Sequence, residues 1–162
     1  MPTERYLEEF QVGERFSTQT VTVDAAMIKA FAAQYDPQPN HLDEELAARG
    51  FFGGLVASGW HTAALTIRLI VESDLRIVGG LVGSAFDDFQ WYRPVRPGDT
   101  LHVEFEVLEI RLPFARKKHG TLRLKIATLN QKGSPVLTLI ANLIVPRRPD
   151  TGIGEEPSAS IV

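Results

Sequence analysis

The chain has 162 residues and a mass of 18.0 kDa, a size that suits one domain with a substantial hydrophobic core. Its formal net charge of -3 argues against the broad basic field of a nucleic-acid-binding protein. The lack of cysteine excludes disulfides, thiolate nucleophiles and cysteine-based zinc sites.

The compartment is read from the start of the chain and from its apolar stretches. The first residues are polar and acidic, unlike a signal peptide. The longest apolar stretch, residues 55–71, is interrupted by polar side chains and is short for a membrane span. We therefore expect a cytoplasmic protein that neither crosses a membrane nor binds nucleic acid.

The first half of the chain favours helices. Residues 16–23 are rich in threonine and valine and predict a strand or extended arm. Apolar residues then recur at helical spacing, which predicts a helix over residues 24–33 with an aspartate at its start. Residues 43–48 predict a short helix, and residues 63–71 are apolar on nearly every face, as in a buried helix.

The second half changes to the period-2 alternation of half-buried antiparallel strands. The pattern predicts strands over residues 81–91, 101–107, 122–126 and 135–145. A buried helix followed by several antiparallel strands indicates an α+β domain whose sheet wraps around that helix. We assign residues 1–146 to this domain, and residues 147–162, which lack periodicity, to a disordered C-terminal tail.

The segment Asp36-Pro37-Gln38-Pro39-Asn40-His41 carries a carboxylate and an imidazole. Each proline fixes its own φ and disfavours a helical residue before it, so we expect a folded loop and no helical turn here. Such a loop would bring Asp36 and His41 together for acid/base chemistry. The alternative is an ordinary surface turn, because all of these residue types suit turns.

A second segment, residues 53–59, leads from paired glycines into the apolar helix. The start of that helix, near Ser58 and Gly59, would present unpaired backbone N–H groups and the positive end of the helix dipole. Both features favour a developing oxyanion. The alternative is that the glycines only permit tight turns and close packing.

These segments resemble the MaoC-like dehydratases and (R)-specific enoyl-CoA hydratases. Residues 36–41 resemble the Asp-x-Asn-Pro-x-His motif of that family, and residues 52–60 resemble its Phe-Gly-Gly-x-Ile-Ala-His-Gly-Met segment. Residues 92–101 are similar to its Phe-x-x-Pro-Val-x-x-Gly-Asp stretch, so the resemblance covers residues 14–146. Family positions are changed at Gln38, Asn40, Ser58 and Trp60, whereas Asp36, His41 and Gly59 are retained.

The resemblance implies a hot-dog fold and a hydratase/dehydratase that interconverts a trans-2-enoyl-CoA and an (R)-3-hydroxyacyl-CoA. It implies that Asp36 and His41 activate and orient water, while the Gly59 N–H holds the thioester oxygen. Further substrate contacts are expected from Gln38, Leu55, Ser58, Trp60 and Arg93. Trp60 would narrow the acyl pocket and favour a short, branched or polar acyl group.

The resemblance implies no metal and no redox cofactor, because coenzyme A enters as part of the substrate. Hot-dog proteins generally pair, so we expect a homodimer or a multiple of dimers. Candidates for the coenzyme A phosphates are Arg93, Arg96, Arg116, Lys117 and Lys118, although each of them also suits a solvated strand end.

Other titratable residues have simpler interpretations. His61 lies within the apolar helix and is expected to be a core residue. Asp87 and Asp88 are neighbours on one strand and would face opposite ways, which prevents them from serving one site easily.

Two rival functions stay open: a hot-dog acyl-CoA thioesterase, and a non-catalytic acyl-CoA binding or assembly subunit.

Overall fold

The computed structural model of the chain describes residues 3–115 and 117–150. In these residues the helical elements are η1 (Leu7–Glu9), α1 (Ala25–Tyr35), α2 (Pro39–Leu42), α3 (Glu44–Arg49) and α4 (Gly59–Val71). The strands are β1 (Arg15–Ser17), β2 (Val21–Thr22), β3 (Gly83–Trp91), β4 (Thr100–Arg111), β5 (His119–Leu129) and β6 (Pro135–Pro146).

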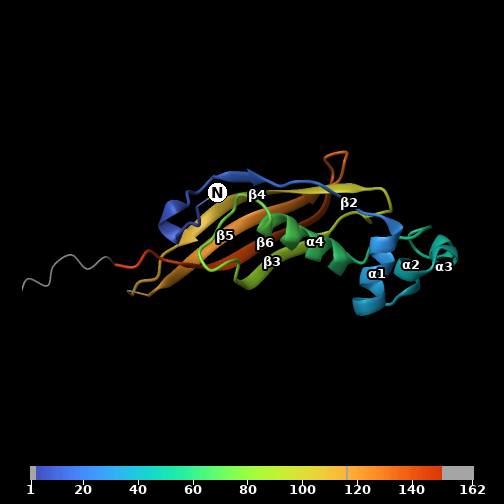
Figure 1. Cartoon of the computed structure of the whole chain (residues 1–162), viewed down its shortest axis with the longest axis horizontal. Helices are drawn as coiled ribbons and strands as arrows, with labels where there is room; N and C mark the ends of the chain where they lie inside the picture. The colour runs from blue at the N-terminus through green and yellow to red at the C-terminus, as the bar shows by residue number, and fades with distance from the viewer. Residues whose placement is uncertain (1–2, 116, 151–162) are drawn as a thin grey trace, which may run out of the picture.

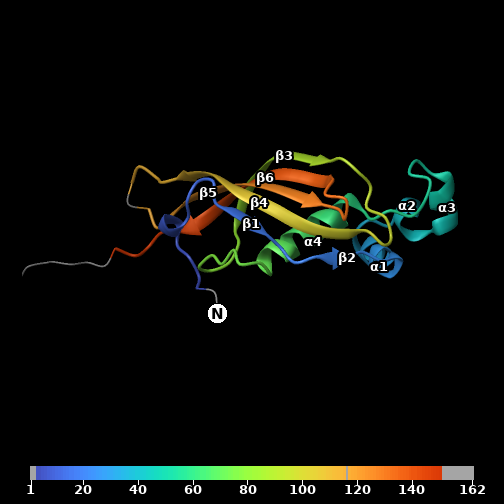
Figure 2. The same ribbon diagram turned by 90° about the horizontal axis from the view of Figure 1, so that it is seen from above.

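The strands form one antiparallel sheet in the order β1-β4-β5-β6-β3, and β2 pairs with β4 near the start of that strand. The helix α4 lies along one face of the sheet, and α1, α2 and α3 gather at one end of it (Figure 1). Figure 2 shows the same layers from above, with α4 beneath the sheet. The expected α+β architecture, a sheet around a central helix, is confirmed.

The core lies between α4 and the sheet. Every second residue of β4 from Leu101 to Val107 is at most 3% exposed, because those side chains share the face that covers the helix. Leu69 and Ile70 of α4 pack against that face. Such burial is worth about 1.5 to 3 kcal/mol for each large aliphatic side chain.

A polar contact inside this core ties the helix to the sheet. The hydroxyl oxygens of Thr66 on α4 and Thr128 on β5 lie 2.6 Å apart, and both residues are fully buried. Because Thr66 also donates to the carbonyl of Thr62, it accepts the hydrogen bond from Thr128. The pair satisfies two buried hydroxyls and fixes the rotation of α4 over the sheet.

One face of α4 is not covered within a single chain. Trp60, Ile67 and Val71 are 60%, 42% and 48% exposed. The expectation of a helix buried on nearly every face is therefore wrong for the isolated chain. The physical reason is that the sheet contacts only one side of α4, which leaves the opposite apolar stripe open.

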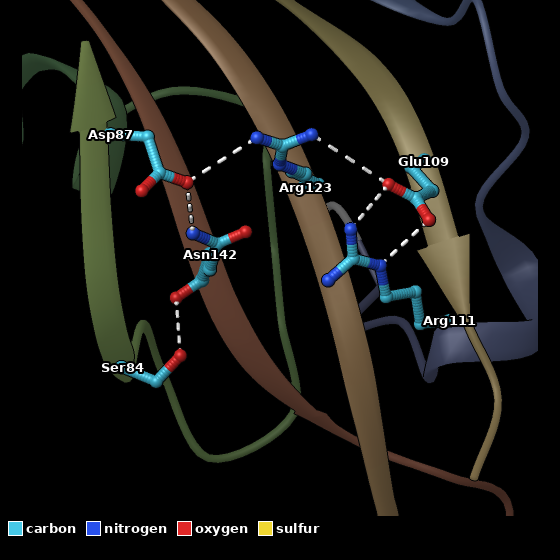
Figure 3. A network of polar contacts seen from close by, with 6 residues as sticks. All are labelled: Ser84, Asp87, Glu109, Arg111, Arg123 and Asn142. Carbon is cyan, nitrogen blue, oxygen red and sulfur yellow. Dashed lines mark hydrogen bonds and ion pairs between the residues drawn. The ribbon is translucent and has the colours of Figure 1, made fainter.

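The outer face of the sheet carries a network of charged and polar side chains (Figure 3). Arg123 on β5 lies between Asp87 on β3, at 3.3 Å, and Glu109 on β4, at 3.8 Å. Glu109 also receives two hydrogen bonds from Arg111, and Asn142 donates to Asp87. Asp87 is thus engaged by a cross-strand ion network, separate from Asp88, whose φ of 47° marks a bulge in β3.

Element boundaries differ from the sequence-based ones at several points. The arm predicted over residues 16–23 is interrupted between β1 and β2, and β4 and β5 extend further than predicted. Arg147 and Arg148, which we expected to begin a loose tail, bind Glu8 and Glu9. The rest of that expected tail, residues 151–162, lies outside the described residues.

No helix in the described ranges is long and apolar enough to cross a membrane.

Candidate active site

The predicted acid/base loop joins α1 to α2. The α1 helix ends at Tyr35, and Gln38 is extended, with φ -99° and ψ 150°. Contrary to our expectation, a helical turn then begins inside the segment, because α2 starts at Pro39. The correction has a simple cause: the first position of a helix needs no N–H donor and suits the fixed φ of proline, while only the residue before the proline must stay extended.

Asp36 follows α1 directly and is held by two side-chain donors. The Gln38 amide donates to Oδ1 at 2.5 Å, and the Ser58 hydroxyl donates to Oδ2 at 2.7 Å. These hydrogen bonds, first that of Gln38 and then that of Ser58, hold the pKa of Asp36 below its ordinary value. The carboxylate is therefore ionised at neutral pH and has a fixed orientation.

His41 lies on α2 and is only 8% exposed. Its Nδ1 is 2.7 Å from the carbonyl oxygen of Val56, and because a carbonyl only accepts, Nδ1 carries a proton. Its Nε2 faces Oδ2 of Asp36 at 3.4 Å. The ring is thus fixed by the backbone on one side and presents Nε2 beside the carboxylate on the other.

The helix α4 begins beside this pair. Ser58 is its N-cap, and the Ser58 hydroxyl accepts a hydrogen bond from the Trp60 N–H at 3.2 Å while it donates to Asp36. The N–H of Gly59, the first helical residue, has no acceptor within the described part of the chain. The loop pair and the helix N-terminus therefore lie at one place, as the sequence predicted.

A cavity of about 550 Å³ opens onto this place. It is lined by both polar and apolar side chains, from Gln38, Asn40, His41, Phe51, Phe52, Val56, Ala57, Gly59, Thr62, Trp91, Tyr92, Arg93, Pro94 and Val95. Its volume is in the range of pockets that hold small ligands. An imidazole, a helix N-terminus and a mainly apolar wall provide acid/base and oxyanion-binding groups together.

The other predicted substrate contacts divide by position. Gln38 and Arg93 line the cavity, whereas Leu55 is buried and Ser58 is fully buried beneath Asp36. Trp60 lies outside the cavity lining and packs its ring against Phe89 and Trp91. The contact of Trp60 with an acyl group stays a prediction.

The candidate phosphate ligands are also separated. Arg93 donates to the carbonyl of Pro135, and Arg96 donates to that of Phe52, both close to the cavity. Lys117 and Lys118 lie in the loop between β4 and β5, at the end of the sheet opposite to α1, α2 and α3 (Figure 1). Arg116 lies outside the described residues.

In the described ranges no three side chains of the metal-binding types come together.

Two site features were missed from the sequence. The carbonyl of Val56, which fixes the His41 tautomer, is a backbone group and leaves no trace in residue types. Trp91 lines the cavity and donates from Nε1 to the carbonyl of Gly59 at 3.0 Å. Its only sequence signal is its place next to residues 92–101, which resemble a family stretch.

A sheet wrapped around a helix defines a hot-dog protein. The carboxylate and imidazole beside the N-terminus of that helix give this protein a pair of acid/base groups. Residues 9–129 match the family described as the MaoC like domain, and the chain belongs to that family.

Known proteins agree with this assignment. A MaoC-like dehydratase from Rhodospirillum rubrum is 48% identical with a TM-score of 0.85, covering 90% of this chain and 99% of its own. The R-hydratase PhaJ1 from Pseudomonas aeruginosa is 30% identical with a TM-score of 0.72, covering 97% of this chain and 96% of its own. The 3-hydroxybutyryl-CoA dehydratase of Methylorubrum extorquens is 31% identical over 65% of this chain and 65% of its own. The chain is similar to hydratases and dehydratases of one family.

Proposed function

We propose that this protein catalyses the reversible addition of water to a trans-2-enoyl-CoA to give an (R)-3-hydroxyacyl-CoA. The observation that carries the proposal is the fixed pair of Asp36 and His41, with Oδ2 and Nε2 3.4 Å apart, beside the Gly59 N–H, which has no acceptor among the described residues. The relatives named as R-hydratase and 3-hydroxybutyryl-CoA dehydratase support the reaction class.

In the proposed mechanism a water molecule is held by both the Asp36 carboxylate and Nε2 of His41. The pair removes one proton as the water oxygen bonds to the β-carbon, and the π electrons of the alkene move toward the thioester carbonyl. The Gly59 N–H donates to the thioester oxygen as it gains enolate charge, aided by the dipole of α4. A proton from the pair then bonds to the α-carbon, and the site regains its starting state.

Each group suits its role in protonation. Asp36 is ionised because its two donors lower its pKa, so it serves as an acceptor of a water hydrogen. The Nδ1–H of His41 donates to the Val56 carbonyl, which leaves Nε2 to take and return a proton. Hydration is not a redox reaction, so the proposed scheme needs no redox group, and it assigns no step to a metal.

The carrier is proposed to be coenzyme A, on the strength of the dehydratase relative. Arg93 and Arg96 are the candidate phosphate contacts nearest to the cavity, because Arg93 lines it and Arg96 donates to the carbonyl of Phe52, which also lines it. The proposed preference for a short, branched or polar acyl group rests on Trp60 alone.

One assay separates the proposed activity from its two rivals. Purified protein is mixed with crotonyl-CoA, and loss of the enoyl absorbance is followed beside release of free thiol. Loss of absorbance without thiol supports a hydratase. Thiol release would indicate a thioesterase, and binding without either signal would indicate a non-catalytic subunit.

Self-association is part of the proposal. The apolar face of α4 formed by Trp60, Ile67 and Val71 is exposed, and β3 is an edge strand of the sheet. Exposed apolar residues next to an unpaired strand edge are typical of surfaces that bind a second copy. We therefore propose a homodimer in which these elements meet.

A further inference from the structure

Trp91 contacts the start of α4 in a way that the proposed mechanism does not use. Its indole N–H donates to the carbonyl oxygen of Gly59 at 3.0 Å. Its ring is so close to Gly59 that an added Cβ there would lie 2.8 Å from the indole, a distance that real side chains avoid. Both contacts fall on the residue whose own N–H has no acceptor in the described ranges.

The indole is itself held from several sides. Its ring centroid is 4.7 Å from that of Phe89 and 5.3 Å from that of Trp60, and these contacts fix its plane. The next residue, Tyr92, donates its backbone N–H to Val136, which anchors the end of β3 on β6. Trp91, although 45% exposed, thus bridges the sheet edge and the helix N-terminus.

This contact of Trp91 bears on the conformation of the Gly59 backbone. A glycine at the first position of a helix has wide backbone freedom and no side chain to hold it. An oxyanion donor accelerates a reaction only when it is aimed before the charge develops. The residue before Gly59, Ser58, is held by its hydrogen bond to Asp36, and the carbonyl of Gly59 is held by Trp91. The two contacts together restrict the Gly59 backbone.

We propose that Trp91 is a positioning residue, which aims the Gly59 N–H at the thioester oxygen through the Nε1 hydrogen bond and the ring contact. The inference rests on the proposed hydratase function. Trp91 acts through Gly59 and forms one wall of the cavity beside it. The Trp91 ring lines the cavity, whereas the Trp60 ring lies outside its lining.

The first test compares Trp91→Phe with Trp60→Phe, the same substitution at the other of the two tryptophans. Trp91→Phe keeps an aromatic ring and removes the N–H donor. We expect its kcat for crotonyl-CoA hydration to fall about threefold to tenfold, the effect of one neutral hydrogen bond, with KM changed by less than about twofold. Trp60→Phe should lower kcat less, because the Trp60 ring makes no hydrogen bond to Gly59.

A second measurement does not depend on turnover. In ¹⁵N–¹H NMR spectra, the amide of Trp60 reports on the Gly59 carbonyl, since both belong to one peptide group. Trp91→Phe should shift this amide in the absence of ligand. Trp91→Tyr provides a second variant with a retained ring if Trp91→Phe is unstable.

The outcomes separate the inference from the function. Wild-type protein that hydrates no enoyl-CoA would defeat the proposed function, and the amide spectra would then decide the Trp91 contact by themselves. A folded Trp91→Phe protein with normal kcat, or with an unshifted Trp60 amide, would overturn the positioning role. Equal loss of kcat in both tryptophan variants would also overturn it, because general aromatic packing would then explain the loss.

Discussion

The Ser58 hydroxyl donates a 2.7 Å hydrogen bond to Oδ2 of Asp36, the same oxygen that faces Nε2 of His41. Ser58 is also the N-cap of α4 and accepts a hydrogen bond from the Trp60 N–H. One buried hydroxyl therefore links the proposed acid/base pair to the helix whose N-terminus is proposed to hold the thioester oxygen. A change at Ser58 should affect both halves of the site.

Ser58→Ala should lower both kcat and stability. We expect about tenfold lower kcat from a less fixed carboxylate, and about 1 kcal/mol less unfolding free energy from the lost cap. Since the Ser58 hydrogen bond lowers the pKa of Asp36, its loss should raise that pKa. Activity that requires the ionised carboxylate would then fall at a higher pH on the acid side of the profile.

The matched control for this variant is Ser73→Ala. Ser73 is a buried serine just beyond the other end of α4, and neither it nor its hydrogen-bond partners Ile70 and Leu75 line the cavity. Its loss should reduce stability without moving the pH profile. A Ser58→Ala profile identical to that of the wild type would remove Ser58 from the orientation of Asp36.

Asp36→Asn and His41→Ala should each cut kcat by at least about a hundredfold, the low end for loss of a general acid or base. Because the two groups act as a unit, the double variant should be little slower than the slower single one. The controls are Asp87→Asn and His102→Ala, which remove a carboxylate and an imidazole on the outer face of the sheet. Near-normal hydration by a folded Asp36 or His41 variant would exclude that residue from the mechanism.

The proximity of Asp36 and His41 could be predicted because local chemistry encodes it. Prolines limit the path of the chain between them, and the surrounding residues resemble a known motif. The prediction missed the one-turn helix at Pro39 because the restriction on the residue before each proline was extended to the whole segment up to His41. The same residues thus gave a correct prediction of proximity and a wrong prediction that no helical turn forms.

The role of Trp91 and the exposed face of α4 could not be predicted in this way. The hydrogen bond from Trp91 to Gly59 joins residues 32 positions apart, and no local pattern specifies such a contact. The apolar stripe on α4 predicts burial but does not identify what covers it. Within one chain Ile67 is 42% exposed, so the sequence pattern agrees better with an assembly than with the isolated chain.

The proposed homodimer is tested through Ile67. Light scattering of the wild-type protein should give a mass of twice 18.0 kDa or a multiple of it. Ile67→Glu should shift the protein toward the monomer, because it places a charge in the proposed interface. Ile144→Glu is the control, since Ile144 is similarly exposed at 38% on β6. A wild-type monomer with full activity would contradict the dimer.

His61 should make the protein less stable in acid. It is 5% exposed, its ring stacks on Phe31 with centroids 4.7 Å apart, and its Nδ1 has no partner in the described part of the chain. Burial lowers the pKa of His61 below its ordinary value of 6.5. The folded state therefore favours the neutral ring, and the unfolded state binds a proton first as the pH falls.

The sign of the pH effect follows from this difference. Stability contributed by neutral His61 is fully present above pH 6.5 and is lost as the pH falls from there toward the lower folded pKa. His61→Phe keeps a ring against Phe31 and cannot titrate. Between about pH 7 and pH 5 its unfolding free energy, measured with urea, should fall less than that of the wild type. Equal slopes for the wild type and His61→Phe would show that burial of His61 does not govern acid stability.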